Sequence, residues 1–137
     1  MAAAPMTPLR EAILLLLCAI GIAVSWRMHR RSILQRRGEL HEESVVSSPR
    51  ARVFFGISNA AIGLVYYAAL AVDSFFFSIP AARLAALVAA SAAALFSLYL
   101  AYSLLFVARA PCRYCWTGHA INWCLLALMV STFVARR

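Results

Sequence analysis

Charged residues are scarce in this sequence, and lysine is absent altogether. Only 13% of the 137 residues are charged, and just five residues are acidic. In contrast, 64% are hydrophobic, against the ~45–50% that is usual in soluble domains. The mean hydropathy of +0.82 points the same way. These figures exclude an ordinary soluble globular domain and leave no room for a soluble catalytic domain.

Four stretches of the chain contain no Asp, Glu, Lys or Arg. They cover residues 12–26, 53–72, 84–108 and 114–135, and hold 15, 20, 25 and 22 residues. A membrane-spanning helix needs about 20 residues, so three stretches qualify as they stand. The first stretch qualifies if its helix begins at Pro8. It is not an obvious secretory signal, because it lacks the strongly basic start and the clean cleavage site of one.

The predicted fold is therefore all-α: an integral membrane bundle of four transmembrane helices, forming a single domain over residues 1–137. The helices are expected at about 8–37, 53–72, 84–108 and 112–135. Thr7 and Pro8 are typical of a helix start, and Gly38 of the position just after a helix end. The chain is expected to cross the cell membrane several times.

The basic residues are all arginine, 13 of them, and they give a formal net charge of +8. A basic balance can indicate nucleic-acid binding. Here the arginines cluster at the ends of the apolar stretches, where they meet lipid headgroups and set orientation. We therefore expect the lipid bilayer as a partner and no nucleic acid.

Polar residues gather at the start of the last apolar stretch, in "APCRYCWTGHAIN" (110–122). At 100° per residue, Cys112, Cys115, His119 and Asn122 share one helix face roughly 80° wide. Cys124 falls on the other side. Because polar side chains in lipid are costly, this face is expected to line the interior of the bundle.

The second stretch offers a partner for that face. In "FFGISNAAIGLVYY", Gly56, Asn59 and Gly63 fall on one stripe, and the glycines permit close helix approach. Counting along both helices puts Asn59 and His119 at the same depth, roughly 10 Å from the membrane surface. Together they could bracket a small ligand that carries two carbonyl groups.

The cysteine spacing leaves several interpretations open. Beside Arg109 and Arg113 at a helix start, Cys112 and Cys115 favour a thiolate, and the second thiol could resolve a disulfide on the first. A zinc site would use these cysteines with His119, but no fourth ligand is visible. The pair could also have no function.

Each polar partner has a plainer interpretation as well. His119 could be an interior histidine whose hydrogen bonds are satisfied by the protein. Asn59 could bond only a neighbouring helix. The shared stripe and the matched depth favour a binding site over these two readings.

Two segments carry a resemblance to a known family. "VVSSPRARVFFGISNAAIGLVYY" (45–67) and "CRYCWTGHAIN" (112–122) resemble the vitamin K epoxide reductase family of four-helix membrane quinone reductases. The resemblance implies that Cys112 and Cys115 are the redox pair and that Asn59 hydrogen-bonds a quinone oxygen. His119 stands where animal members have a tyrosine that contacts the other oxygen. Ser47 and Ser48 match the family's loop serines.

The predicted function is a membrane thiol:quinone oxidoreductase with a quinone as substrate and no metal. Cys112, nearer the helix end, is expected to attack the quinone, and Cys115 to resolve the adduct. A thiol reductant or a thioredoxin-like protein would be the second partner. The alternative is a catalytically inactive four-helix scaffold or subunit that has kept the fold.

Two features depart from the family pattern. The family usually carries a second cysteine pair in the loop after the first helix, whereas this loop has none and Glu42 stands where the nearer cysteine would fall. Cys18 lies inside the first helix and cannot replace it.

Membrane orientation is the second departure. Nine arginines lie on the membrane side where the last helix begins and four on the other, which favours a cytoplasmic position for the cysteine pair. The family has the reverse orientation, so both remain open. The nine are Arg27, Arg30, Arg31, Arg36, Arg37, Arg50, Arg52, Arg109 and Arg113, and the four are Arg10, Arg83, Arg136 and Arg137.

Overall fold

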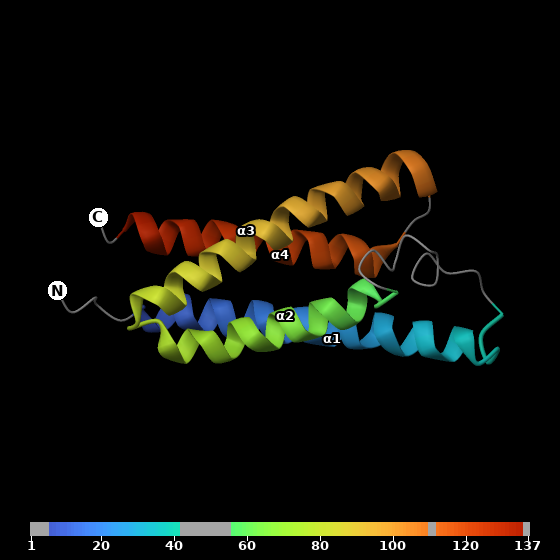
Figure 1. The fold of residues 1–137 in the computed structure, drawn as a ribbon, viewed down its shortest axis with the longest axis horizontal. Helices are drawn as coiled ribbons and strands as arrows, with labels where there is room; N and C mark the ends of the chain where they lie inside the picture. Colours follow the sequence, from blue (N-terminus) through green and yellow to red (C-terminus); the bar gives the residue numbers. More distant parts are fainter. Residues whose placement is uncertain (1–5, 42–55, 110–111, 136–137) are drawn as a thin grey trace.

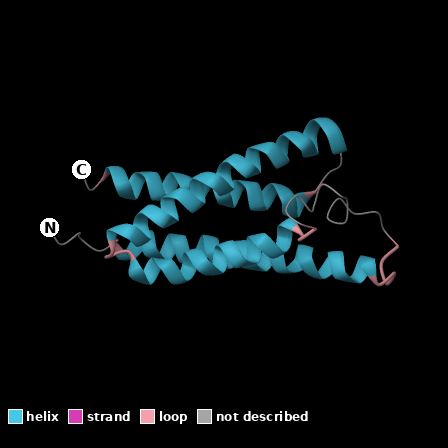
Figure 2. Cartoon of the chain, in the orientation of Figure 1, coloured by secondary structure: helices cyan, strands magenta, loops and turns pink. Residues whose placement is uncertain are grey.

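The computed structural model describes residues 6–41, 56–109 and 112–135, and within these ranges every regular element is helical (Figures 1 and 2). The elements are α1 (Pro8–Arg36), α2 (Asn59–Asp73), the 3₁₀ turn η3 (Ser74–Phe76), α3 (Pro80–Tyr102), the π-helix η4 (Ser103–Ala108) and α4 (Arg113–Val134). Four of the described helical segments are long and apolar enough to cross a membrane. The all-α prediction is confirmed, and the chain is a multi-pass membrane protein.

The helices run alternately up and down the bundle (Figure 1). α1 begins and α4 ends at one end of the bundle. At the opposite end, α1 and η4 finish while α2 and α4 begin, and we call this the cysteine end because α4 starts with the cysteine pair. Towards it, α3 diverges from the other helices, and the candidate site lies at this end of the bundle.

α1 has the boundaries that the sequence predicts. Thr7 is its N-cap, Pro8 its first residue, and Arg37 its C-cap, followed by Gly38 with φ 72°. Its 29 residues correspond to about 43 Å, longer than the ~30 Å hydrocarbon core of a bilayer. The arginine-rich last turns therefore reach beyond the hydrocarbon region at the cysteine end.

The predicted start of the second helix at about residue 53 is wrong, because residues 56–58 are not helical. Gly56 has φ 76°, a conformation outside the right-handed helical region that glycine adopts most readily. Ser58 then caps α2, its Oγ accepting a hydrogen bond from the Ala61 amide at 3.2 Å. Asn59 is therefore the first residue of the helix, not one buried two turns inside it, and Gly56 is not part of its stripe.

The third and fourth helices depart from prediction by a few residues. α3 begins at Pro80 rather than 84, because proline suits the first turn of a helix, where no amide donor is needed. The π-helix η4 carries the helical path to Ala108, as expected, and Arg109 is left-handed with φ 48°. α4 begins at Arg113 with Cys112 as its N-cap.

Two glycines bring α1 and α2 into close contact. A Cβ added to Gly21 would lie 2.8 Å from the Tyr67 ring, and one on Gly63 would lie 2.8 Å from Ser25 Oγ. The role predicted for Gly63 in close helix approach is thus confirmed. Nearer the start of α1, Leu14 and Cys18 are fully buried, as is Leu125 of α4. These side chains pack α1 against α4.

Candidate active site

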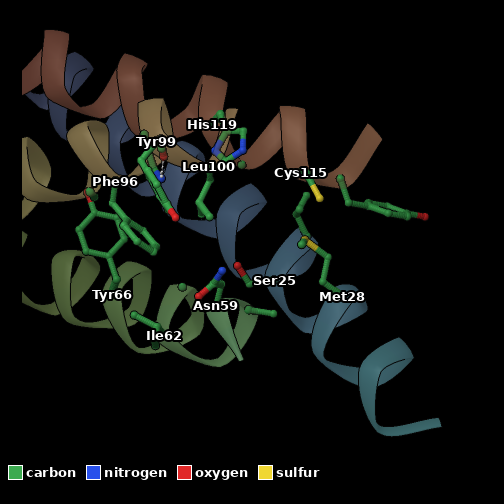
Figure 3. Close-up of a pocket in the computed structure, with 18 of the residues that line it drawn as sticks. Ser25, Met28, Asn59, Ile62, Tyr66, Phe96, Tyr99, Leu100, Cys115 and His119 are labelled. Carbon is green, nitrogen blue, oxygen red and sulfur yellow. Dashed lines mark hydrogen bonds between the residues drawn. The ribbon is translucent and has the colours of Figure 1, made fainter. Parts of the chain in front are cut away.

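A cavity of about 680 Å³ lies within the cysteine end of the bundle, and all four long helices contribute to its wall (Figure 3). Three of the four site residues predicted from the sequence line it: Asn59, Cys115 and His119. The described lining contains no Asp, Glu, Lys or Arg. Such a cavity suits an uncharged ligand that carries a few hydrogen-bonding atoms on an apolar body.

The cysteine pair forms a disulfide, and its two sulfurs face different surroundings. Cys112 and Cys115 are bonded to each other, with their Cα atoms 5.3 Å apart. Cys112 Sγ also accepts a hydrogen bond from the Cys115 amide at 3.2 Å, which caps α4. Of the two, only Cys115 lines the cavity. The helix turn thus places Cys115 in the cavity wall and Cys112 at the start of the helix, while the attack by Cys112 stays a prediction.

His119 is buried in the cavity wall one turn after Cys115, with 7% of its surface exposed. Its ring lies between Trp116, at 6.1 Å and nearly perpendicular, and Trp123, at 6.3 Å. Among the described residues, no hydrogen bond to the imidazole is present. Within the described residues, His119 is therefore not a histidine whose hydrogen bonds are satisfied by the protein. Its ring nitrogens are available to a ligand.

Asn59 lies across the cavity from His119 (Figure 3). Its position at the head of α2 is held by the preceding residue, because Ser58 Oγ lies 3.3 Å from Nδ1 of His29 on α1. Asn59 and His119 were predicted to share a depth by counting residues along two helices. That count was wrong for α2, yet both side chains line the same cavity.

Asn122, the fourth polar residue of the predicted stripe, is used to join helices. Its Oδ1 accepts a hydrogen bond from the Tyr67 hydroxyl at 2.8 Å, and its Nδ2 donates to Ser97 Oγ at 2.7 Å. Tyr67 Oη is also 3.4 Å from the Gly118 carbonyl oxygen. These bonds fasten α2, α3 and α4 together in the cavity wall, and we call Tyr67, Asn122 and Ser97 the triad.

Sequence reasoning missed Tyr67 and Ser97. The signal available was their polarity inside apolar stretches, where a hydroxyl requires a partner in the bundle. Nothing in the spacing of either residue showed that Asn122 would be that partner, because the three residues lie on three different helices.

The remaining cysteines lie outside the cavity wall. Cys18 is buried within α1, as predicted, and Cys124 is exposed on α4, away from the polar stripe. Within the described residues, no three His, Cys, Asp or Glu side chains are grouped so that they could hold a metal ion. Glu42, Ser47 and Ser48 lie outside the described residues.

A family model for the vitamin K epoxide reductase family matches residues 12–130, which include all four site residues. The chain belongs to this family. The match confirms the resemblance and places the protein in a family of oxidoreductases. No curated protein was found to match the sequence.

Proposed function

We propose that the protein is a membrane thiol:quinone oxidoreductase that passes electrons between dithiols and a membrane quinone. The observation that carries this proposal is the position of Cys115: one half of a C-x-x-C disulfide, in the wall of the cavity that Asn59 and His119 line. Membership of the vitamin K epoxide reductase family supports the same chemistry.

The reaction starts from the reduced pair. The Cys115 thiolate adds to a ring carbon of the quinone, and the oxygen that gains charge takes up a proton. The Cys112 thiolate then attacks Cys115 Sγ, which forms the disulfide and breaks the bond between Cys115 Sγ and the ring carbon. The electron pair of that bond stays on the ring, and the second oxygen takes up a proton. Overall, one dithiol and one quinone give one disulfide and one hydroquinone, with two electrons and two protons transferred.

Three features favour this step. Cys115 lies in the first turn of α4, where the helix dipole stabilises a thiolate. Asn59 and His119 lie on opposite sides of the cavity, so each can hydrogen-bond one of the two quinone oxygens. Hydrogen bonds aimed at an oxygen that gains negative charge stabilise the transition state.

Regeneration begins at the other sulfur. A thiol reductant or thioredoxin-like partner attacks Cys112, which is half-buried at the outer edge of the cavity, and so frees the Cys115 thiolate inside it. Because the loop lacks the family's relay cysteines, electrons pass directly to this disulfide. Tyr114, which lines the cavity, lies beside Arg31 of α1, whose guanidinium carbon is 6.0 Å from the centroid of its ring.

The location we propose is the cell membrane. Glu39 is exposed just after α1 at the cysteine end, and a cysteine placed there reports orientation. The Glu39→Cys variant is labelled with an impermeant reagent in intact cells, after Cys124, which is exposed, has been replaced. Labelling would indicate the family orientation. Protection from the reagent would give the orientation that the arginine count favours.

The alternative is an inactive scaffold, and the absent loop cysteines are the observation that favours it. Purified protein in lipid nanodiscs, given a small dithiol and a short-chain quinone, separates the two. We expect hydroquinone to form at a rate that saturates with quinone concentration. A rate equal to that of the dithiol and quinone without protein would favour the scaffold.

A further inference from the structure

Ser25 on α1 packs against Gly63 of α2 and also lines the cavity. The residue is 94% buried, with 6% of its surface exposed, and it lines the cavity. Its Oγ lies 2.8 Å from the position that a Cβ on Gly63 would occupy, one turn beyond Asn59 on α2. Figure 3 shows Ser25 and Asn59 together on the side of the cavity opposite His119.

The Ser25 hydroxyl makes no hydrogen bond to any part of the chain that the structure describes. Hydroxyls in apolar helices usually bond a carbonyl one turn back. Ser91 does so with the Leu87 oxygen at 2.8 Å, and Thr132 with the Leu128 oxygen at 2.8 Å. Because an unpaired buried hydroxyl is costly, a ligand in the cavity is the natural partner for Ser25.

An unpaired hydroxyl alone does not indicate a ligand, as Ser32 shows. It lies on α1 seven residues after Ser25, is 1% exposed, and its Oγ also lacks a partner in the described chain. Ser32, however, is not part of the cavity wall. What distinguishes Ser25 is the combination of an unpaired hydroxyl with a place in that wall, next to Asn59.

The chemistry of a hydroxyl suits both redox states of a quinone. Serine donates one hydrogen bond and accepts others, so it can serve the carbonyl oxygen of a quinone and the hydroxyl of a hydroquinone. Asn59 offers the same two abilities through its amide. A carbonyl oxygen has two lone pairs, so it can accept from both residues at once.

We propose that Ser25 is a quinone-binding residue that donates a hydrogen bond to the same carbonyl oxygen as Asn59. This oxygen lies on the α1–α2 side of the cavity, while His119 serves the other. The assignment rests on the proposed function and adds α1 to the helices that hold the substrate.

The test compares Ser25→Ala with Ser32→Ala, two hydroxyl deletions on one helix that add no atoms. The probe is a short-chain naphthoquinone, whose binding is followed by quenching of the tryptophans beside His119. We expect Ser25→Ala to weaken binding roughly three- to tenfold, the range for one lost hydrogen bond. Ser32→Ala should bind within about twofold of wild type.

Two further arms fix the atom involved. A dimethoxybenzoquinone of equal tail length should lose the same factor in Ser25→Ala, because both quinones present the carbonyl; a loss confined to the methoxy compound would overturn the carbonyl assignment. Combined with Asn59→Ala, the Ser25 deletion should cost less than the product of the two single effects, since both residues serve one oxygen. Independent, multiplicative losses would overturn the shared oxygen.

The outcomes also separate this inference from the proposed function. If wild type converts quinone while Ser25→Ala and Ser32→Ala bind it equally well, the role of Ser25 is wrong and the proposed function stands. If wild type neither binds nor converts either quinone, the proposed function itself fails. Thermal unfolding of each variant confirms that binding is measured on folded protein.

Discussion

Two groups of polar side chains line one cavity and differ in what they bond. The triad of Tyr67, Asn122 and Ser97 is bonded internally across three helices. Ser25 and His119 are buried, like Tyr67 and Ser97, but bond nothing in the described chain. The difference teaches that burial alone does not identify a binding residue. Side chains whose bonds are satisfied hold the wall in place, and unpaired ones that face the cavity are available to a substrate.

The largest effect should come from the cysteine that faces the cavity. Cys115→Ser should abolish quinone reduction, because the serine hydroxyl stays protonated and does not attack the ring. Cys112→Ser should also stop turnover, but it should leave a quinone adduct on Cys115 that mass spectrometry detects. Cys18→Ala and Cys124→Ala are the controls and should retain most of the activity.

That pair of variants also tests which sulfur attacks. An adduct found on Cys112 in the Cys115→Ser protein would support the assignment made from sequence and contradict the geometry of the cavity. Turnover by Cys115→Ser at the wild-type rate would remove the redox pair from the mechanism.

His119 should show the next largest effect. His119→Leu replaces the imidazole with an apolar side chain that forms no hydrogen bonds. It should lower kcat/KM by tenfold or more, because one quinone oxygen is then left without a hydrogen bond in an apolar wall. His119→Tyr keeps a donor and should retain activity. Equal activity of the leucine and tyrosine variants would show that His119 only packs between its two tryptophans.

Asn59 and Tyr67 sharpen the comparison, because they should affect different quantities. Asn59→Ala should weaken quinone binding three- to tenfold. Tyr67→Phe should instead leave quinone affinity close to wild type and lower stability, since it removes a bond inside the protein and leaves Asn122 Oδ1 short of a donor. We expect a loss of about 1–3 kcal/mol in stability. The same response from both variants would erase the distinction between binding and structural residues.

The smallest effect on quinone binding should come from Gly21, which packs against Tyr67 of the triad. In Gly21→Ala, the new methyl would meet the Tyr67 ring at 2.8 Å, so the ring or α1 must shift. We expect a loss of stability of about 1–3 kcal/mol, typical of overpacking, with quinone affinity within about twofold of wild type. A large loss of affinity at unchanged stability would mean that Tyr67 itself touches the substrate.

The sequence was sufficient for the helices but not for their register against one another. Apolar stretches and arginine clusters predicted four spanning helices, and Thr7, Pro8 and Gly38 fixed the bounds of α1. The start of α2 was missed because the stretch from residue 53 is uninterrupted by charge, whereas the helix actually begins where the Ser58 side chain can cap it. Hydropathy does not report such a cap.

For the site, periodicity predicted the face of α4 correctly, with Cys115 and His119 in the cavity wall and Cys124 away from it. Periodicity did not predict that Cys112 caps the helix and lies outside the cavity wall. It also did not predict that the Asn122 amide is hydrogen-bonded to Tyr67 and Ser97. The role of Ser25 was not predicted for a similar reason. Whether a serine hydroxyl has a hydrogen-bond partner depends on the neighbouring helix, and the sequence of one helix does not contain that information.

The central claim is tested most directly by a single turnover of the reduced protein. Wild type, reduced and freed of dithiol, is mixed with excess short-chain quinone, and hydroquinone is counted by absorbance while the disulfide is mapped by mass spectrometry. One hydroquinone per chain, formed together with one Cys112–Cys115 disulfide, is the predicted result. Hydroquinone without that disulfide, or no hydroquinone from a fully reduced pair, would contradict the account.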